Sequence, residues 1–168
     1  DGGRSWRIGA NTSVDQAVGP IPDETAITEL GDGTIVLSSR NGSADAPGRI
    51  FARSTDGADS FAVWPDGDLL QVDEDITTPV VQGSLLTTPD GERAVYASPS
   101  DPRFRRGLTM WTSADGESWA QGPLAVPGPA AYSDLVAVDD ETVGVVVETG
   151  ARNPYERIDF VPVPVEGL

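Results

Sequence analysis

The stretch "STDGADSF" (residues 54–61) combines a serine, an Asp-Gly pair and a final aromatic residue, and the chain repeats this combination. "TSADGESW" (112–119) has the same features, and the opening "DGGRSW" (1–6) matches the second half of the unit. Aspartate accepts hydrogen bonds from nearby backbone N–H groups and glycine permits a positive φ, so each copy predicts a tight turn. The aspartates at 1, 56 and 115 recur at similar intervals, which indicates a repeat architecture.

A second motif lies between these turns. It occurs as "ELGDGTIVLSSR" (29–40), "LTTPDGERAVYAS" (86–98) and "VAVDDETVGVVVE" (136–148), each with a Pro, Gly or Asp turn between apolar segments. This pattern predicts a β-hairpin. We therefore expect strands near residues 25–30, 34–39, 49–54 and 61–64, then 82–87, 93–97, 108–113 and 119–122, and finally 132–138, 142–148 and 157–163.

Four-stranded antiparallel units that recur every 50–60 residues predict an all-β fold made of β-propeller blades. Three such blades cannot close a ring, and the sequence begins within a turn motif. We therefore expect the chain to be the C-terminal part of one larger propeller domain. The expected blades cover residues 1–20 in part, 21–66, 75–123 and 128–168.

The composition excludes several kinds of function. The 168 residues include neither His nor Cys, which removes the commonest metal ligands, a Ser-His-Asp triad and disulfides, so we expect no metal and no cofactor. All eleven basic residues are Arg, against 27 acidic residues, so nucleic acid is an implausible partner. No apolar run approaches the roughly 20 residues that span a bilayer, and we expect no membrane insertion. A calcium site at Asp56 or Asp115 is the weaker interpretation of the turns, because no ladder of acidic positions surrounds either residue.

Five polar residues fall at one end of the expected blades. Glu24 begins one hairpin and Arg40 ends it 16 residues later, while Tyr132 and Glu148 flank another hairpin at the same spacing. Arg105 lies just before the third strand of the middle blade. The two strands of a hairpin place the start of one beside the end of the other, so these side chains should cluster at one end of the strands. The Asp-Gly turns should lie at the opposite end.

These residues resemble a known family. The segments "DETAITELGDGTIVLSSRN", "TPVVQGSLL", "SDPRFRRGLTMWTSADGESW" and "AAYSDLVAVDDETVGVVVE" are together similar to the C-terminal half of bacterial sialidases (neuraminidases). Members of that family are six-bladed propellers with Asp-box (BNR) repeats. The resemblance implies a hydrolase, a retaining exo-α-sialidase that acts on sialylated glycans in carbohydrate metabolism, at the cell surface or after secretion.

The resemblance also implies roles for individual residues. In the family three arginines hold the carboxylate of sialic acid, and Arg40 and Arg105 match the second and third of them. Tyr132 matches the nucleophile and Glu24 the carboxylate that takes its proton. Glu148 matches a glutamate that supports the first arginine. Gln82 and Ser84 match a stretch near the substrate pocket.

The first arginine and the acid/base aspartate of the family have no counterpart in this chain. The resemblance therefore implies that the chain holds part of the site, that the remaining N-terminal blades are its partner, and that it is inactive alone. The structural alternatives are an interblade role for Tyr132, a solvated strand end for Glu24, a surface ion pair for Arg40, and backbone contacts for Gln82 and Ser84. Arg103 and Arg106 are expected to be loop charges. The functional alternatives are a non-catalytic propeller that binds acidic glycans and a trans-sialidase.

Overall fold

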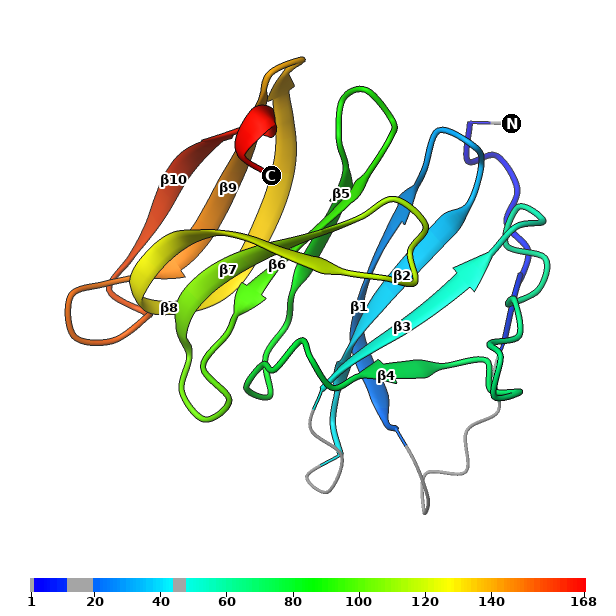
Figure 1. Ribbon diagram of the computed structural model, residues 1–168, viewed down its shortest axis with the longest axis horizontal. Helices are drawn as coiled ribbons and strands as arrows, with labels where there is room; N and C mark the ends of the chain where they lie inside the picture. The colour runs from blue at the N-terminus through cyan, green and yellow to red at the C-terminus, as the bar shows by residue number, and fades with distance from the viewer. Residues whose placement is uncertain (1, 12–19, 44–47) are drawn as a thin grey trace.

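The computed structural model describes residues 2–11, 20–43 and 48–168, which form antiparallel β-sheets and almost no helix (Figure 1). The first sheet has the strand order β1-β2-β3-β4, and the second has the order β10-β9-β8-β7-β6-β5. The strands of the first sheet are β1 (Pro22–Glu29), β2 (Ile35–Asn41), β3 (Arg49–Ser54) and β4 (Gln71–Asp73). Those of the second are β5 (Ser84–Thr87), β6 (Ala94–Pro99), β7 (Arg106–Ser113), β8 (Ala120–Asp139), β9 (Thr142–Thr149) and β10 (Arg157–Pro164). A short 3-10 helix, Val165–Gly167, follows β10.

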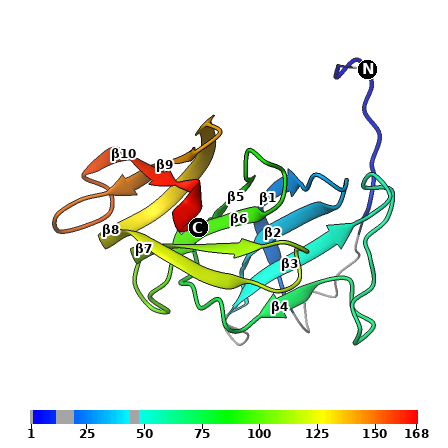
Figure 2. The same ribbon diagram turned by 45° about the horizontal axis from the view of Figure 1, so that its top comes forward.

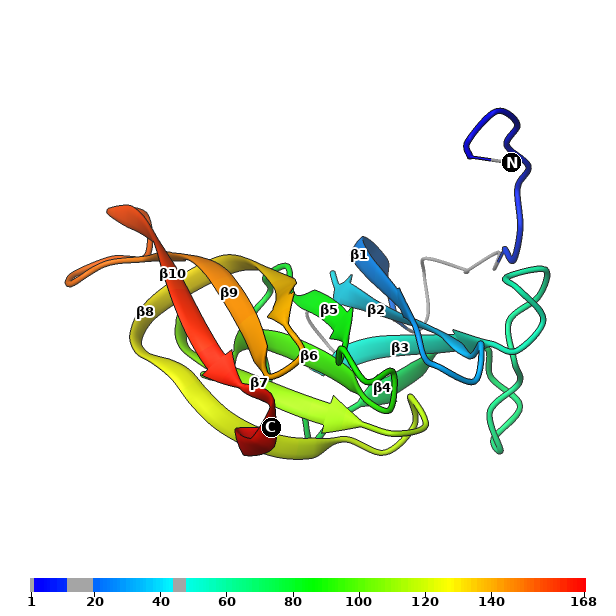
Figure 3. The ribbon, with the colours of Figure 1, turned by 90° about the horizontal axis from the view of Figure 1, so that it is seen from above.

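The long strand β8 gives the second sheet its curled form (Figure 3). Its residues up to Pro129 pair with β7, and its residues from Ala130 onward pair with β9. The six-stranded sheet thus consists of two groups of strands, β5–β8 and β8–β10, that share one continuous strand. The sequence predicted two separate strands at 119–122 and 132–138, and the structure joins them.

Two apolar clusters hold the successive blades together. One lies between the first sheet and β5–β7 and includes Phe51, Trp64, Tyr96 and Trp111. The other lies between β6–β7 and β8–β10 and is rich in valine. Since the blades pack face to face on these clusters, the ends of their strands are held in fixed relation to one another.

Most expected strands are confirmed, and one is wrong. Residues 61–64 form no strand, and the fourth strand of the first sheet is instead β4. In that segment the backbone N–H of Ala62 donates a hydrogen bond to the carbonyl of Arg53. The side chain of Trp64 lies in the core, and the backbone N–H of Trp64 donates to the carbonyl of Asp68. The expected partial blade at 1–20 lies in part outside the described residues. Residues 2–11 form no strand and project beyond the sheets (Figure 2), although Arg7 pairs with Asp59 and the Ala10 N–H donates to the Ala58 carbonyl.

The two Asp-Gly turns follow β3 and β7 directly. The Asp56 carboxylate accepts hydrogen bonds from the hydroxyls of Ser54 and Ser60 and from the backbone N–H groups of Asp59 and Ser60. The bonds from Ser60 are the main reason why the pKa of Asp56 falls to about 2. Asp115 holds the second turn in the same way through Ser113, Glu117 and Ser118. Asp1, in the opening copy of the motif, lies outside the described residues.

Candidate active site

Four strand segments meet at the end of the blades opposite the Asp-Gly turns. Glu24 lies near the start of β1, Arg40 near the end of β2, Tyr132 in β8 and Glu148 near the end of β9. Arg105 immediately precedes β7. The first and second sheets both contribute, so the site exists only because the blades pack together.

Two β-bulges aim the functional side chains. Between the pairs Pro22–Asn41 and Thr25–Ser39, two residues of β1, Asp23 and Glu24, stand opposite the single residue Arg40. A matching irregularity in β8 sets Ala131 and Tyr132 opposite Glu148. A bulge changes the direction in which a side chain points, and bulges are common beside active sites.

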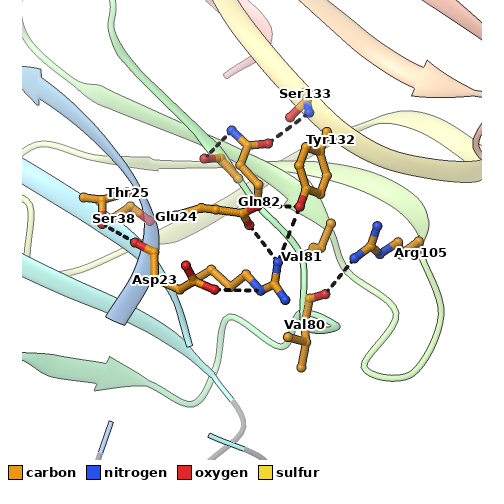
Figure 4. A network of polar contacts seen from close by, with 12 residues as sticks. Asp23, Glu24, Thr25, Ser38, Val80, Val81, Gln82, Arg105, Tyr132 and Ser133 are labelled. Carbon is orange, nitrogen blue, oxygen red and sulfur yellow. Dashed lines mark hydrogen bonds and ion pairs between the residues drawn. The ribbon is translucent and has the colours of Figure 1, made fainter. Parts of the chain in front are cut away.

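Tyr132 and Glu24 form the centre of the site. The Tyr132 hydroxyl donates a hydrogen bond to Glu24 Oε1 at 2.5 Å (Figure 4). Arg40 Nη1 donates to Glu24 Oε2 at 2.8 Å and to the Tyr132 hydroxyl oxygen at 3.4 Å. A carboxylate, a phenol and a guanidinium from three strands of two sheets therefore form one hydrogen-bonded group.

This group sets the charge state of both acids. Burial raises the pKa of Glu24, but the hydrogen bonds from Tyr132 and Arg40 and the charges of Arg40 and Arg105 outweigh it, so the pKa lies below its ordinary value. The hydrogen bond to Glu24, burial and the negative charge of that carboxylate raise the pKa of Tyr132. At neutral pH the pair is thus an ionised carboxylate that accepts a hydrogen bond from a neutral phenol.

Arg105 lies on the other side of the Tyr132 ring. Its guanidinium carbon is 5.4 Å from the ring centroid, a cation–π arrangement. Arg105 Nη1 donates to the Tyr155 hydroxyl at 2.8 Å, and Nη2 donates to the Val80 carbonyl at 3.2 Å. Two guanidiniums, those of Arg40 and Arg105, therefore lie beside Tyr132.

The segment just before β5 accepts hydrogen bonds from two arginines, Arg49 and Arg105. The Val81 carbonyl accepts a hydrogen bond from Arg49, a fully buried arginine of β3 that also bonds Ser38. The adjacent Val80 carbonyl holds Arg105. This short segment thus connects the first blade to a cationic side chain of the site.

Gln82 and Ser84 lie next to Tyr132 through their contacts with Ser133. Gln82 Oε1 accepts a hydrogen bond from the Ser133 N–H at 3.2 Å, and its amide donates to the Gly83 carbonyl. The hydroxyls of Ser84 and Ser133 are 3.0 Å apart. In this structure Gln82 thus makes two backbone contacts, the kind considered as its structural alternative, whereas Ser84 contacts the side chain of Ser133.

Glu148 contacts the same strand. Its Oε2 accepts a hydrogen bond from the Tyr132 N–H at 3.3 Å. An open hollow of about 680 Å³ lies between these elements, and its walls include Glu24, Gln82, Ser84, Tyr132, Ser133 and Glu148. Within the described part of the chain, no three acidic side chains converge to hold a metal ion.

Several contacts of the site were not predicted from the sequence. They are the carboxylate of Asp23, which lies 3.9 Å from Arg40 Nε, the Val80 carbonyl, the hydroxyl of Tyr155, and the N–H and hydroxyl of Ser133. Asp23 could have been found from its position beside Glu24. The other contacts join loops far apart in the sequence, and no periodic pattern indicates them.

The arrangement suits two kinds of chemistry. The neutral phenol of Tyr132, bonded to an ionised carboxylate, can attack an electrophilic carbon while its proton passes to Glu24. The two guanidiniums offer paired N–H donors of the kind that bind a carboxylate.

The described residues contain no helix long and apolar enough to cross a membrane.

Comparison with known proteins places this arrangement in context. No protein-family model matches the chain. The chain is 31% identical over 169 residues to a sialidase of Micromonospora viridifaciens, an alignment that covers 95% of this chain and 24% of the relative. It is 28% identical over 184 residues to a sialidase of Vibrio cholerae, covering 91% of this chain and 22% of the relative. The chain thus spans about a quarter of the length of these relatives.

Solved structures agree in fold. The Hadza microbial sialidase Hz136 superposes with a TM-score of 0.72 and 20% identity, over 99% of this chain and 31% of that one. The leech intramolecular trans-sialidase gives a TM-score of 0.73 and 20% identity, over 100% of this chain and 27% of that one. These matches confirm the predicted fold, blades of a sialidase-type β-propeller. The division of the chain into blades at the expected boundaries stays a prediction.

Proposed function

We propose that this chain, which is homologous to part of the sialidases, supplies much of the active site of a retaining exo-α-sialidase that removes terminal sialic acid from glycoconjugates. The observation that carries this proposal is the 2.5 Å hydrogen bond from the Tyr132 hydroxyl to Glu24, with Arg40 and Arg105 on either side. A module that only binds glycans has little use for a phenol held against an ionised carboxylate.

Tyr132 acts as the nucleophile. Most glycosidases use a carboxylate for this step, and sialidases are an exception. Sialic acid carries a carboxylate on its anomeric carbon, which would repel an anionic nucleophile. A phenol stays neutral until attack, and the raised pKa of Tyr132 keeps its proton in place until then.

Glu24 receives that proton as the bond to the sugar forms. The oxygen of Tyr132 bonds to the anomeric carbon, the bond to the leaving group breaks, and water later releases the sugar from Tyr132. Two displacements at the same carbon give retention of configuration. Glu24 is suited to this role because its pKa is lowered, so it is ionised at neutral pH.

Arg40 and Arg105 bind the substrate carboxylate and fix the orientation of the sugar. Glu148 holds the backbone of Tyr132 and supports the first arginine of the family's set of three. Gln82 and Ser84 form the wall of the substrate hollow. We further propose that the turns at Asp56 and Asp115 are Asp-box (BNR) repeats and that the protein is secreted or displayed at the cell surface.

The test is hydrolysis of a fluorogenic sialoside by the protein in its full natural length. Tyr132→Phe should lower kcat by at least ~100-fold, since it removes the attacking oxygen while leaving the ring. Tyr96→Phe is the matched control, because it removes the same atom from the core. The proposal is wrong if Tyr132→Phe retains the wild-type rate.

Two alternatives have distinct outcomes. A wild-type protein that binds sialosides and never cleaves them is a glycan-binding propeller. A protein that passes the sugar to an acceptor other than water is a trans-sialidase. The leech intramolecular trans-sialidase has the same fold as this chain. Analysis of the released sugar separates transfer from hydrolysis.

A further inference from the structure

A second hollow adjoins Arg105 on the side away from β1. It has a volume of about 570 Å³ and lies between the loop before β7, residues 100–105, and the loop between β9 and β10, residues 150–156. Its walls include Phe104, Arg105, Arg106, Arg152 and Tyr155. We call it the Arg106 groove. Arg105 belongs to its wall and also contacts Tyr132, so the groove lies next to the candidate active site.

The groove gathers positive charge in a strongly acidic chain. Three of the eleven arginines line it, although the formal net charge of the chain is -16. Arg106 and Arg152 form no ion pair with any residue that the structure describes. In a chain with such an excess of carboxylates, two arginines without a carboxylate partner leave their guanidinium forks open to an anion from outside.

The nearest carboxylates are occupied within their own loops. Glu156 accepts hydrogen bonds from the backbone N–H groups of Ala151 and Arg152 and from the side chain of Asn153. Asp101 accepts the backbone N–H groups of Arg103 and Phe104. These bonds shape the two loops; the charge of Asp101 also interacts with those of Arg103 and Arg106, but neither carboxylate forms an ion pair with Arg106 or Arg152.

Two aromatic rings complete the groove. The side chain of Phe104 is 64% exposed and that of Tyr155 is 62% exposed. Large exposed rings beside a few charged groups are typical of a ligand site, where the rings contact the apolar face of the ligand and the charges fix its orientation. Tyr155 also holds Arg105, so its position is tied to that of the active site.

We propose that the Arg106 groove is a subsite for an anionic group on the part of the glycan beyond the cleaved sugar, either the carboxylate of a second acidic sugar or a sulfate. The proposal rests on the proposed function, because Arg105 is taken to hold the carboxylate of the terminal sugar. Arg106 and Arg152 bind the second anion, and Phe104 and Tyr155 contact the sugar ring that carries it. The protein therefore prefers acidic glycans in which two anions lie within about one sugar unit of each other.

The test compares three sialosides that differ only in the sugar next to the cleaved residue, which is neutral, carboxylated or sulfated. The full-length protein should cleave one of the acidic substrates with a higher kcat/KM than the neutral one. In Arg106→Ala/Arg152→Ala this ratio should fall ~3- to 10-fold, the effect expected for partly exposed charge-assisted contacts. The carboxylated and sulfated arms identify which anion is bound.

Arg103→Ala is the matched control, since it removes an exposed arginine of the same loop that does not line the groove. It should leave the ratio unchanged. Arg106→Lys/Arg152→Lys keeps the charge without the fork and should give an intermediate ratio. An unchanged ratio in the double alanine variant would overturn the proposal.

A binding measurement separates this proposal from the proposed function. If the wild-type protein cleaves none of the three sialosides, the proposed function fails and the groove is tested by calorimetry with the same compounds. Tighter binding of an acidic compound than of the neutral one, lost in Arg106→Ala/Arg152→Ala and kept in Arg103→Ala, supports the groove. Equal binding of all three compounds overturns it.

Discussion

Glu24 receives hydrogen bonds from two different groups, a phenol on Oε1 and a guanidinium on Oε2. Both partners favour its ionised form, which is why its pKa lies below the ordinary value of 4.5 despite partial burial. In the proposed mechanism the carboxylate must be ionised to accept the proton of Tyr132. Activity should therefore be present above this pKa and be lost as the pH falls through it.

For the protein in its full natural length we expect the acidic limb of kcat/KM against pH to lie below pH 4.5. Glu24→Gln should lower kcat by ~100-fold or more, as for the loss of a general base, and should abolish this limb. The pH profiles of both proteins check the prediction. A limb that persists in Glu24→Gln would assign it to another group.

Tyr155 holds a guanidinium of the site without touching the reacting atoms. Its hydroxyl accepts a hydrogen bond from Arg105 at 2.8 Å, and Tyr155→Phe removes that acceptor. We expect KM for a simple sialoside to rise ~3- to 10-fold with kcat nearly unchanged, because the arginine proposed to bind the substrate carboxylate is less well fixed. Steady-state kinetics would contradict this if kcat fell while KM stayed constant.

The sequence predicted the centre of the site better than its supports. Glu24, Arg40, Tyr132 and Glu148 lie at hairpin ends, where equal spacing implies proximity. The contacts of Arg105 with Val80 and Tyr155 cross 25 and 50 residues of sequence and depend on loop conformation, which the alternation of apolar residues does not encode. Local patterns thus indicate which residues meet across a hairpin, and tertiary packing decides the rest.

At the scale of the element, the two Asp-Gly turns differ by one residue. In the first turn Gly57 and Ala58 both have positive φ, 73° and 65°, and in the second only Gly116 does, with a φ of 70°. The extra residue of "STDGADSF" thus requires a second left-handed backbone position. Among the described residues Ala58 is the one residue other than glycine with positive φ, and this conformation is strained for a residue with a Cβ atom.

Ala58→Gly should therefore raise the free energy of unfolding by about 0.5–1 kcal/mol, the relief of strain less the greater entropy of glycine in the unfolded chain. Ala114→Gly in the second turn is the control, because Ala114 has no positive φ to relieve. It should lower the free energy of unfolding by a similar amount. Urea denaturation of the three proteins measures both changes, and destabilisation by Ala58→Gly would refute the argument.

Strand positions were predictable where an apolar run follows a turn signal and were missed where a strand is very short. β2 and β9 each contain three consecutive apolar residues after a turn and lie close to their predicted bounds. β4 has only three residues, too few for a periodic signal. The sequence therefore predicts the fourth strand of this sheet at residues 61–64 and not at β4. The prolines at 123, 127 and 129 lie within β8, where the pairing with β7 is irregular and tolerates missing N–H donors.

At the scale of the whole molecule, one sheet face has no partner within the described residues. The outer face of β8–β10 exposes several large apolar side chains, namely Val136, Val138, Val146, Ile158 and Phe160. The opposite face of these strands packs into the valine-rich cluster. An exposed apolar area of this kind is typical of a surface that is covered in a larger assembly.

We expect the 168-residue chain alone to give no measurable turnover of a fluorogenic sialoside. The resemblance to sialidases implies a third arginine and an acid/base aspartate that this chain does not supply, so neither full substrate binding nor protonation of the leaving group is possible. An assay of the purified chain at high concentration, beside the full-length protein, checks this. Turnover by the chain alone would contradict the expectation.

The continuity of β8 has a consequence for how the protein unfolds. Because one strand is hydrogen-bonded to β7 along its first half and to β9 along its second, with no loop between, loss of either blade releases amides of the same strand. Native-state hydrogen exchange should therefore report β7, β8 and β9 as one cooperative unit rather than as two foldons. Tyr132 lies only two residues beyond Ala130, where the pairing changes, so the candidate active site belongs to this one unit.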